Sequence, residues 1–187
     1  MKNQQSKYSD SLISLSKNRN IFLYETVTKE MASSLCALLI YYDSKNNDPI
    51  KMYINSNGGD MSAMFQIYDT MQMIKSPINT ICLSKAYSAG SVILAAGTKG
   101  MRQCLKHANI MIHGVQLVFP VMPDHDPSSS QSYLNFVNNN NENMLTILSK
   151  HTGQTVDRVR QDCKRDLFLD CEEAISYGVV DSVLTEL

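Results

Sequence analysis

Ser88 stands among small residues in the segment KAYSAGSVILAAG, residues 85–97. A serine hydroxyl is a poor nucleophile until a base removes its proton, and the base works best when a third group orients it. Two residues elsewhere in the chain have suitable settings for these roles. His113 ends the apolar segment NIMIH, and Asp166 has charged residues before it and apolar residues after it. Together the three residue types suit acyl transfer by a serine nucleophile.

The remaining histidines have poorer settings for a catalytic base. His107 precedes a strand-like segment, His125 lies between prolines, and His151 lies at the end of a helical segment. A serine among alanines and glycines can also simply fill a tight crossing of a helix with a strand, and a histidine at a strand end can be a core residue. Spacing alone does not bring the three candidates together, so both interpretations stay open here.

A tetrahedral intermediate needs hydrogen-bond donors for its oxyanion. The N–H of Ala89 follows the serine at the start of a predicted helix, where the helix dipole favours negative charge. The turn Asn57-Gly58-Gly59 offers a second donor, because glycine lets a substrate approach the backbone closely. Met64, on the helix after this turn, is a candidate for a substrate pocket, although core packing explains an apolar helix stripe equally simply.

Alternating strand and helix patterns surround these candidates. Strands are predicted at 21–25, 50–55, 78–83 and 108–113, and helices at 29–42, 61–74 and from about residue 88. Strand and helix therefore alternate three times before residue 113. This order predicts an α/β fold with a mainly parallel sheet covered by helices and joined by right-handed crossovers.

The later part of the chain begins with a segment rich in turn-forming residues. Residues 114–132 contain three prolines and a serine run and are predicted to be irregular. A long helix is predicted at 133–150, with the run Asn138–Asn141 facing solvent. Further predicted features are a helix capped by Thr155, a capping box of Asp170 and Glu173 on a helix ending at Tyr177, a left-handed Gly178, and a closing strand at 179–184.

Composition restricts the classes of function. The 187 residues carry a net charge of −1 and no basic run, which argues against binding to nucleic acid or to an anionic membrane. The N-terminus is too polar for a signal peptide and no apolar run could span a bilayer, so a cytoplasmic location is expected. The five cysteines form no CxxC pair and are expected to be buried free thiols rather than a disulfide or a zinc site.

No metal and no cofactor are expected. The triplet Asp124-His125-Asp126 contains possible metal ligands, but without further ligands a solvated loop explains it better. The chain shows no internal repeat and no second domain, so residues 1–187 are expected to form one domain.

Five long segments, in order along most of the chain, resemble the ClpP family of self-compartmentalising serine proteases. They are NRNIFLYETV (18–27), YINSNGGDMSAMFQIYDTMQMI (53–74), TICLSKAYSAGSVILAAGTKGMRQCL (80–105), ANIMIHG (108–114) and HTGQTVDRVRQDCKRDLFLDCEEAISYGVVDSVL (151–184). The resemblance implies that Ser88 is the nucleophile, His113 its base and Asp166 the orienting acid. It also implies oxyanion-hole amides at Gly59 and Ala89.

The resemblance implies further properties of the molecule. The expected fold is crotonase-like, with residues 1–17 as a tail and a protruding helical handle at about 114–150. The expected activity is that of a serine endopeptidase acting on unfolded polypeptides, with Gly58, Gly59 and Met64 contacting an extended substrate. The expected partners are copies of the chain in heptameric rings, stacked as a tetradecamer, and an AAA+ unfoldase.

Three departures from the family pattern limit these expectations. Asn57 occupies the place of a proline in the oxyanion turn, which predicts a slightly looser loop. The segment after His113 lacks the family's Gln-Pro and glycine-rich strand, and its Phe119, Val121 and Met122 could cover the site or form an interface. The segment before residue 18 is shorter than the N-terminal tail of the family, which argues against the family's contact with an unfoldase.

These departures leave two other functions open. The chain could be a regulatory or structural subunit of a mixed ring, with low activity alone and activation by a paralogue. It could also use the same scaffold on acyl-CoA thioesters, although that chemistry does not require a Ser–His–Asp triad.

Overall fold

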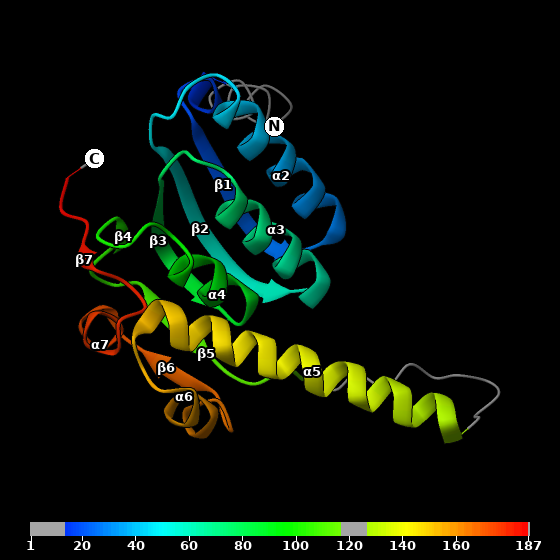
Figure 1. The fold of residues 1–187 in the computed structure, drawn as a ribbon. Helices are drawn as coiled ribbons and strands as arrows, with labels where there is room; N and C mark the ends of the chain where they lie inside the picture. The colour runs from blue at the N-terminus through cyan, green and yellow to red at the C-terminus, as the bar shows by residue number, and fades with distance from the viewer. Residues whose placement is uncertain (1–13, 117–126, 187) are drawn as a thin grey trace, which may run out of the picture.

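The computed structural model describes residues 14–116 and 127–186. Within these residues a seven-stranded sheet forms the centre of the molecule (Figure 1). Its main path runs β1 (Asn20–Val27), β2 (Ile50–Gly59), β3 (Ile78–Tyr87), β4 (Arg102–Cys104) and β7 (Ser182–Val183). Beside this path, β5 (Asn109–Ile112) pairs with β3 and β6 (Leu167–Leu169). Every pairing is parallel except that of β5 with β6, so the predicted α/β fold with a mainly parallel sheet is confirmed.

Helices cover one face of this sheet. Figure 1 shows α2 (Lys29–Asp43), α3 (Met61–Met73) and α4 (Ala89–Ala95) packed in front of the strands. The apolar stripes of α2 and α3 meet the inward residues of the strands, as Leu39, Ile54 and Ile67 are fully buried. The burial of alternate residues along β2 follows from the two-residue period of a strand.

Local signals at the helix ends agree with the sequence predictions. The side chain of Thr28 accepts a hydrogen bond from the Met31 N–H at 3.2 Å, so it caps α2. Asp170 and Glu173 form the predicted capping box at the start of α7 (Cys171–Tyr177). Gly178 has φ of 96°, the left-handed conformation in which glycine ends a helix without steric cost.

The long helix α5 (Pro127–Thr152) projects from the body as a rod (Figure 1). It begins six residues before the predicted start, so the prediction of an irregular segment is wrong for 127–132. Proline favours the first position of a helix because its missing N–H has no helical acceptor there. The rest of that segment, from 117 to 126, lies outside the described residues.

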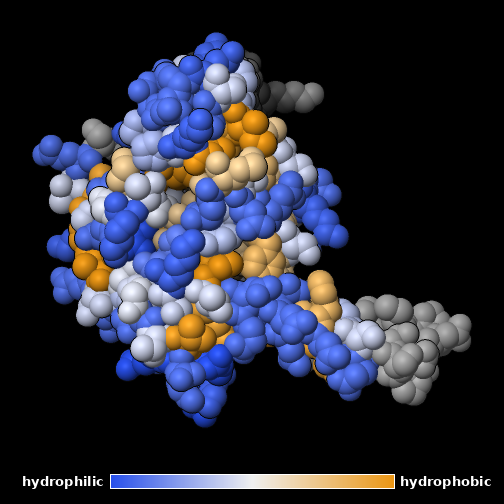
Figure 2. Space-filling view, in the orientation of Figure 1, coloured by the Kyte–Doolittle hydropathy of each residue, from blue (hydrophilic) through white to orange (hydrophobic). Residues whose placement is uncertain are grey.

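The surface of α5 is mostly hydrophilic, interrupted by hydrophobic residues toward its projecting half (Figure 2). Phe136 is 54% exposed on this half. Among the described residues, no helix combines the length and the apolar character needed to cross a bilayer.

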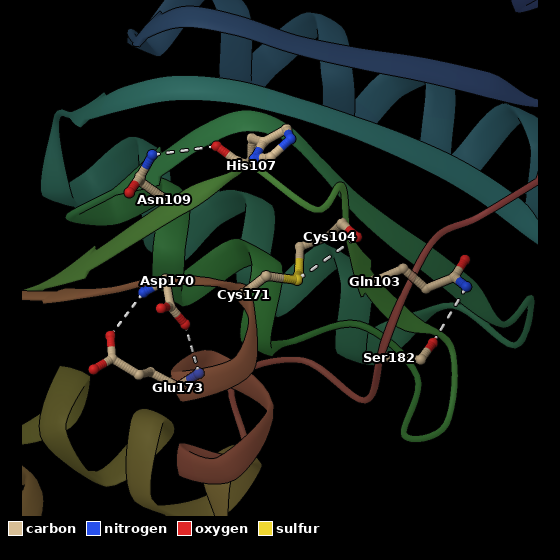
Figure 3. The surroundings of a disulfide bond; sticks show 8 residues. All are labelled: Gln103, Cys104, His107, Asn109, Asp170, Cys171, Glu173 and Ser182. Atoms are coloured by element: carbon tan, nitrogen blue, oxygen red, sulfur yellow. Dashed lines mark hydrogen bonds between the residues drawn. A yellow bond between two sulfur atoms is a disulfide. The ribbon is translucent and has the colours of Figure 1, made fainter.

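One prediction about the cysteines is wrong. Cys104 and Cys171 form a disulfide between β4 and the first residue of α7 (Figure 3). They lie 67 residues apart in sequence, and β4 is too short for its alternation to be recognised. The expectation of buried free thiols holds for Cys36, Cys82 and Cys163. Burial raises the pKa of Cys82 and of Cys163 to about 12, so both remain protonated thiols near neutral pH.

A buried ion pair joins the end of the sheet to the helices. The side chain of Arg102 is 1% exposed and that of Asp181 14%, and their closest charged atoms lie 2.6 Å apart. Arg102 also donates from Nη1 to the carbonyl oxygens of Ala95 at 3.2 Å and His151 at 2.8 Å. All three acceptors lie on different elements, so this one guanidinium connects β4, α4, the end of α5 and the turn before β7.

Candidate active site

Ser88 lies in the sharp turn between the end of β3 and the start of α4. Its φ of 53° and ψ of −123° are uncommon for a residue other than glycine. Its N–H donates to the Met111 carbonyl at 2.9 Å, and its own carbonyl accepts from the Ser91 hydroxyl at 2.6 Å. Strained backbone of this kind persists only where the surroundings hold it, and it is common at functional sites.

Strand register brings His113 beside this serine. β5 pairs with the last residues of β3, with Tyr87 opposite Met111, and His113 follows β5 directly. The Nε2 atom of His113 lies 2.8 Å from the Ser88 Oγ. The imidazole is only 13% exposed, so the surrounding protein holds it in place.

The same strand also positions the acid. β6 runs antiparallel to β5 with Ile112 opposite Leu167, so the preceding Asp166 lies opposite His113. The Asp166 Oδ1 lies 3.2 Å from the His113 Nδ1, and the carboxylate side chain is 51% exposed. Ser88, His113 and Asp166 therefore lie in one series of polar contacts, a hydrogen bond between the first two and a charged-pair contact between the last two, although each comes from a different part of the chain.

This arrangement defines the histidine tautomer that acyl transfer requires. To accept the serine proton, Nε2 must be unprotonated, so the ring hydrogen belongs on Nδ1, where it can be donated to Asp166. The side-chain amide of Gln116 also lies 3.5 Å from Nδ1. Gln116 could not be predicted as part of the site, because no pattern in the sequence marks its position after the strand.

The glycine turn after β2 packs directly against the serine. Gly58 has φ of +88°, and a Cβ there would lie 2.6 Å from the Tyr87 carbonyl oxygen and 2.7 Å from the Ser88 Cβ. The buried Ser56 hydroxyl accepts from the Gly58 N–H at 3.0 Å and donates to the Glu25 carbonyl. Ser56 thus holds the turn in shape, a role that the sequence pattern did not reveal.

A cleft of about 470 Å³ opens beside the serine. Gly59, Ala89, Ser88 and His113 lie in its wall. The Ala89 N–H is the first of α4, so the helix itself offers it no acceptor. The Ala89 N–H is thus a backbone donor next to the hydroxyl, and Gly59 lies in the same cleft wall.

The rest of the cleft wall is mainly apolar. Met64 contributes to it while being only 2% exposed, so this side chain also belongs to the core. The other large apolar side chains of the wall are Met61, Met111, Val115, Phe136, Val137 and Met144. Methionine is flexible and polarisable, so such a wall can adapt to apolar side chains of different shape.

The other histidines lie apart from this site or outside the described residues. His151 contacts Tyr68, whose hydroxyl lies 3.2 Å from its Nε2. Burial lowers the pKa of His151 to about 4, so the ring is neutral at physiological pH. His125, with Asp124 and Asp126, lies outside the described residues, as do Phe119, Val121 and Met122.

Comparison with known protein families gives a match over nearly the whole chain. The model of a family described as Clp protease matches residues 3–187. The match includes every residue of the site described above.

Proposed function

The chain belongs to the Clp protease family, and we propose that it is a serine endopeptidase that hydrolyses unfolded polypeptides with Ser88 as its nucleophile. His113 acts as the base and Asp166 as the group that orients it. The observation that carries this proposal is the pair of distances, 2.8 Å from Ser88 Oγ to His113 Nε2 and 3.2 Å from His113 Nδ1 to Asp166 Oδ1.

The chemistry proceeds as acyl transfer in two halves. The Ser88 Oγ attacks the peptide carbonyl carbon while His113 takes the hydroxyl proton, and Asp166 stabilises the resulting imidazolium. The N–H groups of Gly59 and Ala89 bind the oxyanion. His113 then gives its proton to the leaving amine, and water attacks the acyl-enzyme with His113 again acting as base.

The substrate in this proposal is an extended polypeptide. Its main chain pairs with backbone groups at Gly58 and Gly59, and an apolar side chain enters the cleft beside Met64. The proposed reaction needs no cofactor. His113 carries out the proton transfers, Asp166 stabilises the imidazolium, and the backbone N–H groups stabilise the oxyanion.

Assembly and supply of substrate are also part of the proposal. Residues 1–187 form one protease domain, and heptameric rings of it stack into a tetradecamer that encloses the sites. An AAA+ unfoldase feeds polypeptides into this chamber. Family membership supports these partners, and the projecting helix α5, with its exposed Phe136, offers the surface for contact between rings.

Two measurements on the purified assembly test the proposed activity together. A peptide phosphonate that reacts with activated serines should modify Ser88, as located by mass spectrometry, and a small fluorogenic peptide with an apolar residue before the cleaved bond should be hydrolysed. Heat-unfolded protein is the control for nonspecific labelling. A correctly assembled ring that is neither labelled nor active would contradict the proposal. Labelling with weak turnover, raised by a paralogous subunit, would favour a regulatory role in a mixed ring.

A substitution in the glycine turn should lower activity without unfolding the protein. Gly58→Ala places a methyl group within 2.7 Å of the Ser88 Cβ, so the turn and the serine must move apart. A displacement of this size next to the reacting atoms typically costs about 100-fold in kcat/KM.

Gly100→Ala is the matched control for this variant. Gly100 has φ of +86°, close to the +88° of Gly58, but a Cβ there would meet nothing within 4 Å. Both variants therefore carry the same backbone strain, of about 1–2 kcal/mol, and only Gly58→Ala carries the clash. Equal kcat/KM in the two variants would show that the glycine turn does not position the serine.

A further inference from the structure

The backbone that follows His113 is held by two hydrogen bonds from outside its own strand. The Gly114 N–H donates to the Cys163 carbonyl at 2.8 Å. The Val115 N–H donates to the side-chain Oδ1 of Asn141 at 2.9 Å. These bonds fix the two residues directly after the proposed catalytic base.

Asn141 is the last residue of the asparagine run in α5, and its environment differs from that of the first two. Asn138 and Asn139 are exposed, whereas Asn141 is half-buried. Met144 and Leu145, three and four residues later, are buried against the body, so this face of the helix points toward the core. The expectation that the whole run faces solvent is therefore wrong for Asn141.

The segment between His113 and this asparagine has little room to move. A Cβ on Gly114 would lie 3.2 Å from the Cys163 carbonyl oxygen and 3.3 Å from the Asn141 Oδ1. Val115 packs against the hydrophobic core. A half-buried backbone N–H such as that of Val115 costs free energy when it has no acceptor, so the Asn141 bond is the stable arrangement.

The two anchors of this segment are themselves tied together. Cys163 follows α6 (Val156–Asp162), and Asn141 lies on α5. Arg160 of α6 donates from Nη2 to the Oε2 of Glu142 on α5 at 2.8 Å. The backbone after His113 is thus held by a unit of two connected helices.

We infer that Asn141 is a positioning residue for His113, acting through the Val115 N–H. It touches none of the reacting atoms. It sets the direction in which the chain leaves His113 and so keeps Nε2 within reach of Ser88 and Nδ1 within reach of Asp166. This role rests on the proposed function, since it matters for turnover only if His113 is the base.

The test compares three single variants of the assembled protein. Asn141→Leu removes the acceptor at similar volume and should lower kcat about 10-fold with KM changed less than about 2-fold, because substrate contacts remain. Asn141→Asp replaces the amide oxygen with a carboxylate oxygen, which can still accept from the Val115 N–H, and should retain kcat within about 3-fold of the parent. Asn138→Leu, on the exposed part of the same run, should have no effect on kcat.

Hydrogen exchange measured by mass spectrometry gives a readout that does not depend on catalysis. The peptide containing Gly114 and Val115 should exchange faster in Asn141→Leu than in the parent, and at the parent's rate in Asn141→Asp. Particle size and melting temperature confirm assembly, and Asn141→Ala replaces the leucine variant if the latter fails to assemble.

The possible results separate this inference from the proposed function. A parent protein that is neither labelled by the phosphonate nor active overturns the proposed function, and with it the role of Asn141 in turnover. An active parent with unchanged kcat in Asn141→Leu, or with unchanged exchange at Val115, overturns the inference alone. A kcat that falls as far in Asn141→Asp as in Asn141→Leu also contradicts the inference.

Discussion

Ser88→Ala should reduce kcat by about 10⁴-fold or more while leaving the assembly and melting temperature near those of the parent. The substitution removes the atom that forms the bond to the substrate carbonyl. The remaining turnover then comes from slow direct attack of water on that carbonyl, assisted only by the oxyanion donors. A backbone φ of 53° is as unfavourable for alanine as for serine, so the substitution adds no backbone strain to the folded state. The measurement is turnover of a fluorogenic peptide by the purified ring.

Ser84→Ala provides the control, because Ser84 is exposed on β3, four residues before Ser88. It should retain parental turnover and remain open to labelling by the phosphonate at Ser88. Turnover by Ser88→Ala within about tenfold of the parent would mean that another residue carries the chemistry.

Asp181→Asn should lower the free energy of unfolding at pH 7 by about 3–5 kcal/mol, because it leaves the buried Arg102 guanidinium without its counter-ion. In the parent, Arg102 meets the carboxylate at 2.6 Å with its side chain 1% exposed. The backbone N–H groups of Gly100 at 2.7 Å and Arg102 at 3.0 Å also donate to the same carboxylate. An amide can accept some of these bonds but cannot balance the charge.

The same pair makes stability depend on pH. Burial alone would raise the pKa of Asp181, but hydrogen bonds from the side chain and the backbone of Arg102 outweigh it and hold the pKa well below its usual range. A lowered pKa in the folded state means that the contribution is fully present above the unfolded pKa of about 4 and is lost as the pH falls below it. The parent should therefore lose more stability than Asp181→Asn between pH 5 and about pH 3.

Urea unfolding at fixed protein concentration, at about pH 7, 5 and 3, measures both effects. Asp69→Asn is the matched control, since Asp69 is exposed on α3 and carries the same change of charge. If the free energy of unfolding of Asp181→Asn lies within about 1 kcal/mol of the parent value at pH 7, the ion pair does not stabilise the fold as predicted.

Elements with a strong period could be predicted from the sequence, and short ones could not. The alternation of 50–55 and the three- and four-residue steps of 61–74 correspond to β2 and α3, because a half-buried strand or helix must repeat its apolar residues at its own period. β4 and β6 have three residues each, which is too few for any period to show. They exist because neighbouring strands offer hydrogen-bonding edges, which is a property of the assembled sheet.

The residue types of the site could be predicted from the sequence, but their positions relative to one another could not. Small residues around Ser88, a histidine ending an apolar strand and an acid before an apolar run identified the three candidates. Their meeting depends on the pairing of β5 with both β3 and β6, a register that no local pattern encodes. Supporting contacts such as that of Asn141 join residues far apart in the chain and so leave no sequence signal.

The bridge between Cys104 and Cys171 closes a covalent ring that contains residues 104–171, in the second half of the chain. Both His113 and Asp166 lie on that ring, whereas Ser88 lies outside it. A single cut in the backbone anywhere between the bridged positions leaves the two pieces joined by the sulfur–sulfur bond. If a protease cuts the backbone once in this region, the two pieces therefore stay together until a reductant opens the bridge.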